Sequence, residues 1–333
     1  MENTKKRIFS GIQPSGNLTI GNYLGALRNW VQLQDDYECI YCVVNMHAIT
    51  VRQDPAVLRR RSLETMAIFL ACGISPEKSI LFIQSHIPEH TMLNWVMCCN
   101  TYMGEAQRMT QFKDKSARHA DNINTGLFTY PVLMASDILL YQADLVPVGA
   151  DQKQHIELTR DLCTRFNNTY GETFVLPEPY IPKIGARIMS LQEPQKTMSK
   201  SDPNPNAFIC ILDEPDVIVR KLKRAVTDSE GVIAYDPDNR AGVSNLLSIY
   251  AACTGKSMDQ SVKDFEGQGY GSLKNTVADV VVDTLSPIQA EYNRIISDKE
   301  YLSKVIEEGD RKASAIAQRT MRKVYHKVGL DSK

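Results

Sequence analysis

The sequence predicts an α/β fold in which a parallel β-sheet is covered by helices on both faces and is followed by a second, all-helical domain. Three observations carry this prediction. Short apolar segments alternate with amphipathic segments through the first half of the chain, as in consecutive strand–helix–strand units. A polar, proline-spaced stretch from Glu193 to Asn206 then interrupts the periodicity. Beyond it, apolar residues recur mostly at helical spacing.

Four segments have the length and composition of strands. They are residues 7–11, 39–44, 79–84 and 144–149. Between the second and the third, Asp54 is suited to cap a helix, Pro55 to occupy its first position and Gly73 to end it. The side chains expected on the buried stripe of this helix are Leu63, Met66, Ala67, Leu70 and Ala71.

A second amphipathic stretch is heavily apolar for a surface helix. It is either a subunit interface or part of the core, and the pattern alone allows both. Its stripe consists of Met92, Trp95, Val96, Cys99, Tyr102 and Met103. The last helix, at about residues 310–328, is expected to pack back on the first domain. Its stripe consists of Ala313, Ile316, Ala317, Thr320, Met321 and Val324.

A chain of 333 residues with 43% hydrophobic residues is long enough for roughly two domains. We place the first at residues 1–190 and the helical one at residues 191–309. No apolar segment reaches the ~18 residues of a membrane span, and the N-terminus lacks the pattern of a signal peptide. The expected location is therefore the cytoplasm, with no membrane partner.

The eight cysteines are scattered through apolar stretches and are expected to be buried, reduced thiols. Cys39 and Cys42 share one strand and face opposite sides, so they cannot bind one metal ion together. No metal site is expected. The net charge of −1 leaves RNA binding to local basic patches, for which residues 59–61 and 220–224 are candidates. Either run can also be a solvated helix face.

Two common nucleotide-binding signatures are absent from the sequence. A dinucleotide site needs G-x-G-x-x-G directly after the first strand, where residues 10–16 read SGIQPSG. The segment Thr254-Gly255-Lys256-Ser257 resembles the end of a P-loop, but the glycine required five residues before Gly255 is Tyr250. We interpret this segment as a helix-ending turn.

A different nucleotide-binding arrangement follows the first strand. A loop rich in glycine, proline and serine leads into a helix that begins near Gly21 and Asn22. Free backbone N–H groups and the positive helix end would face an anionic ligand there. Because glycine has no Cβ, a purine or ribose can rest on the backbone at position 21. Taken alone, the loop can also be a tight strand-to-helix turn.

The second element is Met198-Ser199-Lys200-Ser201, which lies in the 193–206 loop. A lysine flanked by small hydroxyl residues on a flexible loop can close over a polyphosphate and neutralise developing charge. An exposed loop lysine is the simpler explanation of this element alone. Together with residues 14–22, however, it resembles the paired signatures of class I aminoacyl-tRNA synthetases.

Within that class, the sequence resembles the bacterial tryptophanyl-tRNA synthetases nearly end to end. The matching segments are residues 9–28, 109–117, 136–141, 144–161, 185–191, 225–231 and 270–274. The resemblance implies a Rossmann-like catalytic domain in a homodimer. It implies an enzyme that uses ATP, with Mg²⁺ carried on the ATP, to adenylate tryptophan and then charges tryptophan tRNA. Two alternatives are a tyrosyl-tRNA synthetase-like enzyme and a weakened paralogue that binds RNA or a partner.

The resemblance also implies roles for individual residues. Those expected to act in catalysis are Lys200, Lys115, Thr19 and Asn22. The ATP site is expected to include Gln13, Pro14, Ser15, Gly21, Asn22, Gly149, Ala150, Asp151, Ile188, Thr197, Met198, Ser199, Lys200 and Ser201. The tryptophan site is expected to include Asp137, Phe9, Gly11, His47, Met134, Val146, Val148 and Gln152.

Physical reasoning supports the choice of Asp137. It lies in an apolar helix, on one face with Met134 and Tyr141. A buried carboxylate needs a partner, and an indole N–H is a donor-only group that would bind it. Phenylalanine or tyrosine would leave Asp137 unpaired. A bond from Asp137 to water or to another chain segment is the alternative, and His47 alone would more simply be structural.

The chain departs from the usual family pattern at three places. Asn45 and Met46 stand where the family usually has a carboxylate and an amide, and Ala150 replaces a usual glutamate. Thr197 stands where the loop motif usually has its first lysine. Lys196 lies one position earlier and is a candidate substitute, although a shift of one residue redirects its side chain.

Overall fold

The computed structural model describes residues 5–109, 123–149, 152–181 and 187–331. Its centre is a five-stranded sheet in the order β3-β2-β1-β4-β5, in which every strand pair is parallel. The strands are β1 (Arg7–Ile12), β2 (Glu38–Val43), β3 (Ser79–Ile83), β4 (Leu145–Pro147) and β5 (Glu178–Tyr180). The predicted α/β fold with a parallel sheet is confirmed.

All four strands expected from the sequence are present, and β5 is an addition. It was not predicted because Glu178-Pro179-Tyr180 is short and contains no apolar alternation. The strand order reverses between β1 and β4, since β1 pairs with both β2 and β4. Loops that leave the carboxyl ends of these two strands therefore diverge and open a crevice, which is where open parallel sheets bind ligands.

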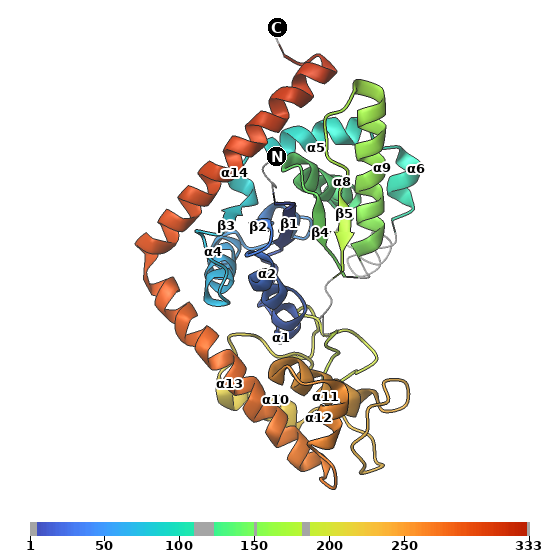
Figure 1. Cartoon of the computed structure of the whole chain (residues 1–333), viewed down its shortest axis with the longest axis vertical. Coiled ribbons are helices and arrows are strands. Elements are labelled where there is room, and N and C mark those ends of the chain that lie inside the picture. The colour runs from blue at the N-terminus through green and yellow to red at the C-terminus, as the bar shows by residue number, and fades with distance from the viewer. Residues whose placement is uncertain (1–4, 110–122, 150–151, 182–186, 332–333) are drawn as a thin grey trace.

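Helices surround the sheet and form a separate group at one end of the molecule (Figure 1). In the first half they are α1 (Ile20–Asn22), the π-helix η1 (Tyr23–Leu27), α2 (Arg28–Leu33), α3 (Asn45–Ala48), α4 (Pro55–Ala71), the 3₁₀ helix η2 (Gln84–His86), α5 (Glu89–Cys99) and α6 (Met103–Gln107). Further along are α8 (Thr125–Leu140), α9 (Lys153–Tyr170), α10 (Pro215–Lys223), α11 (Ala241–Thr254), α12 (Met258–Lys263), α13 (Tyr270–Ser297) and α14 (Lys299–Val328). Of the helices described, none has the length and apolarity required to cross a membrane.

The alternation of side chains along β2 separates two buried clusters. Cys39 and Tyr41 face the cluster that includes α2, α4 and the helical group α10–α13. Ile40 and Cys42 face the cluster that includes α5, α8, α9 and the second half of α14. The expectation that Cys39 and Cys42 point to opposite faces is confirmed. All eight cysteines are free thiols, but Cys99 is exposed, so the expectation of burial is wrong there.

Helix α4 has the predicted ends. Asp54 caps it by accepting a hydrogen bond from Val57 N at 2.9 Å, and Gly73 has a φ of +100°. The predicted stripe is correct from Met66 to Leu70, but Leu63 is 42% exposed. Ser62 and Thr65 are buried instead, so the buried face passes beside Leu63. The interpretation of residues 254–257 is also confirmed, because α11 ends at Thr254 and Gly255 adopts the left-handed conformation.

The apolar stripe of α5 and α6 divides into a buried and an exposed part. Val96 is 6% exposed and packs in the core. Trp95 is 69% exposed, Tyr102 65% and Met103 64%, so these three do not pack in the core of their own chain. Their exposure leaves an apolar surface on the outside of these two helices.

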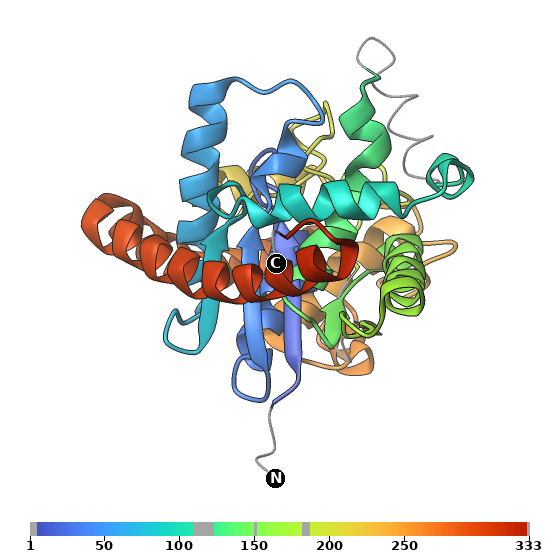
Figure 2. The same ribbon diagram turned by 90° about the horizontal axis from the view of Figure 1, so that it is seen from above.

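The C-terminal helix α14 crosses the edge of the sheet and lies against β3 and α5 (Figures 1 and 2). Gly309 makes the closest approach, because a Cβ built there would stand 1.6 Å from the carbonyl oxygen of Leu81. Next to it, Asp310 accepts from the N–H of Ile83 at 3.3 Å and lies 2.6 Å from Nδ1 of His86. The close approach at Gly309 and the hydrogen bond to Asp310 thus hold α14 against β3.

Candidate active site

The candidate site begins where β1 ends, beside the reversal of strand order. Gly11 lies near the end of β1, and a Cβ at this position would stand 2.7 Å from Cγ1 of Val44. A larger residue would therefore displace Val44 at the end of β2. After Ile12 the chain turns through Gln13, Pro14 and Ser15 toward α1, and Pro14 is buried in this turn.

The start of α1 is a reciprocal capping arrangement. The side chain of Thr19 accepts from Asn22 N at 3.3 Å, and Asn22 Oδ1 accepts from Thr19 N at 2.9 Å. Thr19 is 1% exposed. The polar groups expected to bind ATP thus also fix the helix that presents Gly21. The turn is further attached by Ile20 N, which donates to Ile209 O, and Ile211 N, which donates to Leu18 O.

Gly21, Ile188 and Met198 lie together in the structure. A Cβ built on Gly21 would stand 3.6 Å from Cβ of Ile188 and 3.9 Å from Cβ of Met198. Met198 N donates to Ile188 O at 3.0 Å, and both apolar side chains are buried. Gly21 is therefore a neighbour of Ile188 and Met198, which come from a distant part of the sequence.

Lys200 connects the two predicted nucleotide-binding segments. Its Nζ donates to the carbonyl oxygen of Gln13 at 2.8 Å. Gly16, at φ +112°, lies against the stem of the lysine, since a Cβ there would stand 3.5 Å from Lys200 Cδ. Burial, and secondarily the charge of Arg61, lowers the pKa of Lys200 to about 8. Removal of the ammonium from water disfavours its charge, and so does a second cation nearby.

At the position of the missing first lysine, Thr197 is held by an arginine. Arg187 donates to Thr197 Oγ1 from Nε at 3.1 Å and from Nη2 at 3.0 Å. Lys196 instead forms an ion pair with Glu193. In this structure Lys196 is therefore paired with Glu193, and its substitution for the missing first lysine stays a prediction. Thr197, Ser199 and Ser201 are exposed.

Asp137 is the centre of a buried hydrogen-bond network. His47 Nε2 lies 2.7 Å from Oδ2, His90 Nδ1 lies 2.6 Å from Oδ1, and Gln84 Nε2 donates to both oxygens at 2.8 and 2.9 Å. Because an ionised carboxylate only accepts, both histidines donate to it. Tyr141 completes the network, with its hydroxyl 2.8 Å from His90 Nε2.

This network changes the physical argument about Asp137. Burial alone would raise the pKa of Asp137, but the contacts with His47 and His90 outweigh it and lower the pKa to about 2. The carboxylate is therefore ionised and partnered before any ligand binds. Three side chains donate to it, and a carboxylate offers roughly four lone-pair sites. Because the Gln84 amide contacts both oxygens, four hydrogen bonds already reach the carboxylate, and a further donor would take the place of one of the two Gln84 contacts.

Gln13 joins the nucleotide side of the site to Asp137. Its Nε2 donates to the backbone oxygen of His47 at 3.1 Å, while its own backbone oxygen accepts from Lys200. The His47 side chain then contacts Asp137. A continuous set of contacts therefore runs from Lys200 through Gln13 and His47 to Asp137.

Asn45 and Met46, which depart from the usual family pattern, form hydrogen bonds with residues of η2. Asn45 exchanges two hydrogen bonds with Ser85, donating to its hydroxyl at 2.8 Å and accepting from its N–H at 3.1 Å. Met46 N donates to Oε1 of Gln84 at 3.0 Å. The backbone of Met46 therefore orients the Gln84 amide, whose nitrogen faces Asp137.

The remaining predicted tryptophan-site residues lie around these groups to different depths. Phe9 stacks on Tyr141 with ring centroids 5.4 Å apart, and Val146 is buried. Gly149 is exposed, and the half-buried members are Met134, Val148 and Gln152. Lys115, Ala150 and Asp151 lie outside the described residues.

Sequence reasoning missed Gln84 and His90. Gln84 follows directly on strand β3, at the carboxyl edge of the parallel sheet, and is 0% exposed. His90 is also 0% exposed, on α5. Gln84 could have been predicted as a site residue, because it is a polar residue at the end of an apolar strand. No comparable signal marked His90, because its partners come from another helix.

Comparison with known proteins identifies the family of this chain. Residues 1–286 match the model of the class I tRNA synthetases for W and Y. The chain belongs to this family. Over 99% of its length it is 57% identical to a tryptophan–tRNA ligase of Clostridium tetani, of which it covers 97%. It is 56% identical to a tryptophan–tRNA ligase of Clostridium perfringens over 99% of both chains.

Solved structures agree with the family assignment. The tryptophanyl-tRNA synthetase of Mycoplasma pneumoniae superposes with a TM-score of 0.91 at 38% identity, with 99% of both chains covered. The tryptophanyl-tRNA synthetase of Campylobacter jejuni, in complex with ADP and tryptophan, has a TM-score of 0.83 at 34% identity and covers 97% of this chain and 99% of its own. The predicted family resemblance and Rossmann-like fold are confirmed.

Proposed function

We propose that the site activates tryptophan with ATP, forming tryptophanyl-adenylate and pyrophosphate, and then transfers tryptophan to the 3′ end of tryptophan tRNA. The observation that carries the proposal is the connection through Gln13, which joins the Lys200 loop to the buried Asp137 network. Adenylation requires an amino acid carboxylate and an ATP α-phosphate side by side. A residue that contacts both halves of the site is suited to hold them there.

The prediction of a tryptophan–tRNA ligase is confirmed by identity over nearly the full chain to two curated enzymes of that name. The ADP and tryptophan bound to the Campylobacter jejuni relative support a nucleotide and tryptophan as ligands. Tyrosine enzymes share the fold, as in the Aeropyrum pernix tyrosyl-tRNA synthetase with a TM-score of 0.70 at 19% identity. That likeness concerns the fold alone.

The first chemical step needs no protein nucleophile. A carboxylate oxygen of tryptophan attacks the α-phosphate, the bond to the bridging oxygen of the β-phosphate breaks, and pyrophosphate leaves with that electron pair. Catalysis then consists of positioning and charge stabilisation. We assign the stabilisation to Lys200 together with Lys115, and the placement of the adenosine to the capped turn Thr19–Asn22.

The rest of the ATP site follows from the same placement. Ile188 and Met198 lie over Gly21 and would enclose the adenine, while Gly149, Ala150 and Asp151 would contact the ribose side. Contacts from the loops are assigned to Gln13, Pro14, Ser15, Thr197, Ser199 and Ser201. Mg²⁺ is carried on the ATP phosphates, since this ion keeps several waters and binds substrate phosphates readily.

Tryptophan selection is assigned to Asp137. Its carboxylate is ionised, and an indole N–H can bind it in place of one of the two Gln84 contacts. A phenylalanine ring offers no donor, and tyrosine donates from a phenol O–H whose position differs from that of an indole N–H, so neither ring pairs with Asp137 as tryptophan does. The walls of this pocket are assigned to Phe9, Gly11, His47, Met134, Val146, Val148 and Gln152.

We place tRNA recognition on the helical group and retain the proposed division into residues 1–190 and 191–309, with α14 extending back along the sheet. Fewer side chains of the basic run at residues 220–224 are available to contact RNA than the sequence suggested. Lys221 is 5% exposed and pairs with Asp213 at 2.6 Å, so it cannot contact RNA without losing that partner. Arg220, Lys223 and Arg224 are exposed and remain candidates for phosphate contacts.

A homodimer is proposed through the outer surface of α5 and α6. Trp95, Tyr102 and Met103 are each more than 60% exposed on these two helices, and the ring of Tyr102 lies against the guanidinium of Arg165. Such surfaces mark interaction sites on otherwise polar proteins. Static light scattering of the wild type and of Trp95→Asp tests this assignment, with loss of the dimer expected in the variant. We place the enzyme in the cytoplasm, where uncharged tRNA is available.

The function is tested by tryptophan-dependent exchange of labelled pyrophosphate into ATP, followed by charging of tryptophan tRNA. Exchange is expected with tryptophan and Mg·ATP, and tyrosine should give none above background. Exchange with tyrosine instead would favour the tyrosine enzyme. Absence of exchange with either amino acid would favour a weakened paralogue and overturn the proposal.

A further inference from the structure

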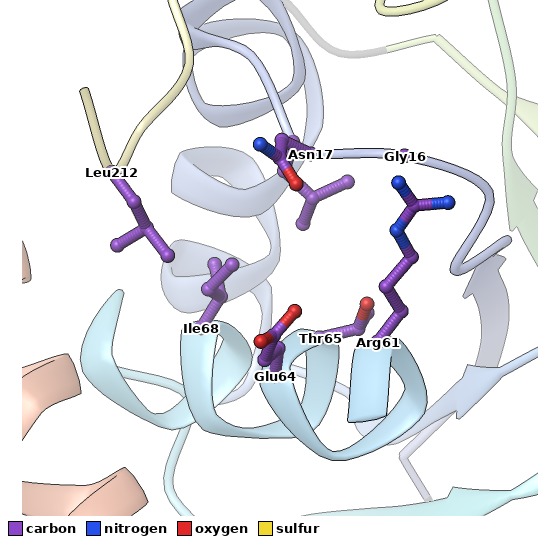
Figure 3. Close-up of a pocket in the computed structure, with 8 residues that line it drawn as sticks. Gly16, Asn17, Arg61, Glu64, Thr65, Ile68 and Leu212 are labelled. Atoms are coloured by element: carbon purple, nitrogen blue, oxygen red, sulfur yellow. The ribbon is translucent and has the colours of Figure 1, made fainter. Parts of the chain in front are cut away.

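Arg61 differs from the two arginines that precede it on α4. Arg59 and Arg60 are exposed, and Arg60 pairs with Glu64 at 3.3 Å. Arg61 is partly buried, and its side chain extends from the helix toward Gly16 (Figure 3). Its Nε is buried without a hydrogen-bond partner, and within the described parts of the chain no carboxylate forms an ion pair with it. A solvated helix face does not explain such an arginine.

The pocket beside Arg61 opens on the nucleotide loop. Gly16 and Asn17 form one side of it, and Arg61 and Thr65 form the other. Glu64 is the one carboxylate in its lining, and Glu64 is already paired with Arg60. The guanidinium therefore faces the backbone of the loop that follows β1, with no anion of the pocket lining bound to it.

Two cations approach the same glycine. Lys200 passes Gly16 at the distance given above, and Arg61 approaches it from α4 (Figure 3). The nearby guanidinium contributes to the lowered pKa of the Lys200 ammonium, as expected for like charges close together. Placing two cations together is unfavourable unless an anionic ligand binds there. The nucleotide loop indicates which anion that is, because it belongs to the ATP site.

We propose that Arg61 binds the β- and γ-phosphates of ATP, and the pyrophosphate that leaves, together with Lys200. The inference rests on the proposed adenylation reaction. A guanidinium presents paired donors that match phosphate oxygens, and it stays charged at any physiological pH. When the α-phosphate is attacked and the Pα–O bond to the β-phosphate breaks, the negative charge that grows on the leaving oxygens lies next to two cations.

The matched test compares Arg61→Met with Arg60→Met. Both remove one charge from the same helix turn, but Arg60 is exposed and paired with Glu64. In tryptophan-dependent exchange, Arg61→Met is expected to raise the KM for pyrophosphate and for ATP by on the order of 10-fold, the value of one charge-assisted hydrogen bond. Arg60→Met should stay within about 2-fold. Arg61→Lys should recover part of the loss.

Two further measurements separate phosphate binding from a merely structural role. Inhibition by AMP and binding of tryptophan should be unchanged in Arg61→Met, because neither ligand has β- or γ-phosphates. Binding of pyrophosphate measured by calorimetry, which needs no turnover, should weaken to the same extent as the KM rises. A structural residue would instead weaken all ligands together and lower the melting temperature.

The outcomes distinguish this inference from the proposed function. If the wild type exchanges but Arg61→Met has the same KM for pyrophosphate as Arg60→Met, the inference is wrong and the function stands. If the wild type fails to exchange with tryptophan, the proposed function is wrong. Calorimetry then still decides whether Arg61 binds pyrophosphate.

Discussion

The two halves of the site are built in opposite ways. On the tryptophan side, Asp137 and His90 are 1% and 0% exposed, and their polar atoms are bound to one another before a ligand arrives. On the ATP side, Lys200 and Arg61 come from a loop and a helix, approach one glycine and lack an anionic partner among the described residues. Selection of a small apolar ligand requires a fixed acceptor, whereas charge stabilisation requires cations that the substrate itself neutralises.

This comparison predicts that removal of a cation affects rate, while removal of the acceptor affects recognition. Lys200→Ala is expected to lower kcat of tryptophan-dependent exchange by on the order of 10²- to 10³-fold, the usual effect of one group that stabilises transition-state charge. The KM for tryptophan should change little, because Lys200 contacts Asp137 only indirectly, through Gln13 and His47. Steady-state exchange kinetics measure both constants.

Lys196→Ala is the control, since Lys196 lies in the same loop and pairs with Glu193. It should retain nearly wild-type kcat. Equal losses in the two variants would mean that loop charge in general, and not Lys200, determines the rate.

Asp137→Asn is expected to lower kcat/KM for tryptophan by on the order of 100-fold, because an amide cannot accept from two histidines and an indole at once. The KM for ATP should stay close to that of the wild type. Ser136→Ala is a suitable control, since Ser136 is buried on the same helix and its hydroxyl donates to Val132 O rather than to Asp137. A large rise in the KM for ATP would show that the two halves are coupled more tightly than we infer.

The two halves should also differ in their response to pH. The pKa of Lys200 is lowered to about 8, so the ammonium is charged below that pH and loses its proton above it. Binding of ATP to the free enzyme should therefore weaken by up to about tenfold per pH unit above pH 8. The pKa of Asp137 is lowered to about 2, so its charge is constant throughout this range.

The variant Arg61→Met gives a second test of this pH dependence of ATP binding. Without the neighbouring guanidinium, the pKa of Lys200 should rise and the decline in ATP binding should begin at higher pH. Fluorescence titration with ATP between pH 6.5 and pH 9.5 at roughly constant ionic strength measures the shift. A decline that persists in Lys200→Ala would assign it to another group.

The smallest effect is expected at the outer end of the tryptophan-side network. Tyr141→Phe removes the hydroxyl next to His90 Nε2 and should destabilise the protein by about 1 kcal/mol, with a rise of a few-fold in the KM for tryptophan. Denaturant unfolding and exchange kinetics measure these two quantities. A loss as large as that of Asp137→Asn would mean that Tyr141 fixes the position of Asp137.

The sequence predicted the elements that depend on local pattern and missed those that depend on distant partners. Helix α4 was predictable because Asp54, Pro55 and Gly73 mark its ends within one segment. Leu63 lies on the predicted stripe yet faces solvent, because the buried face of α4 passes through Ser62, Thr65 and Met66. Strand β5 was not predictable, because its three residues pair only once β4 is in place.

The same division holds within the site. Gly21 and Lys200 belong to motifs, so their proximity could be predicted from the family resemblance. The hydrogen bonds to Asp137 from His47, His90 and Gln84 could not be predicted, because these partners come from three other elements. Arg61 looked like part of a solvated basic run. Only the folded structure distinguishes Arg61 from Arg59 and Arg60, because it shows the direction in which the Arg61 side chain points.

The contact of Gly309 with Leu81 has a consequence for solubility. β3 is an edge strand, and an uncovered edge offers unpaired N–H and C=O groups to other chains. Helix α14 covers that edge, and Asp310 occupies the N–H of Ile83. The opposite edge strand, β5, contains Pro179, which lacks an N–H to donate. The sheet is thus closed to strand addition by a helix on one side and by a proline on the other.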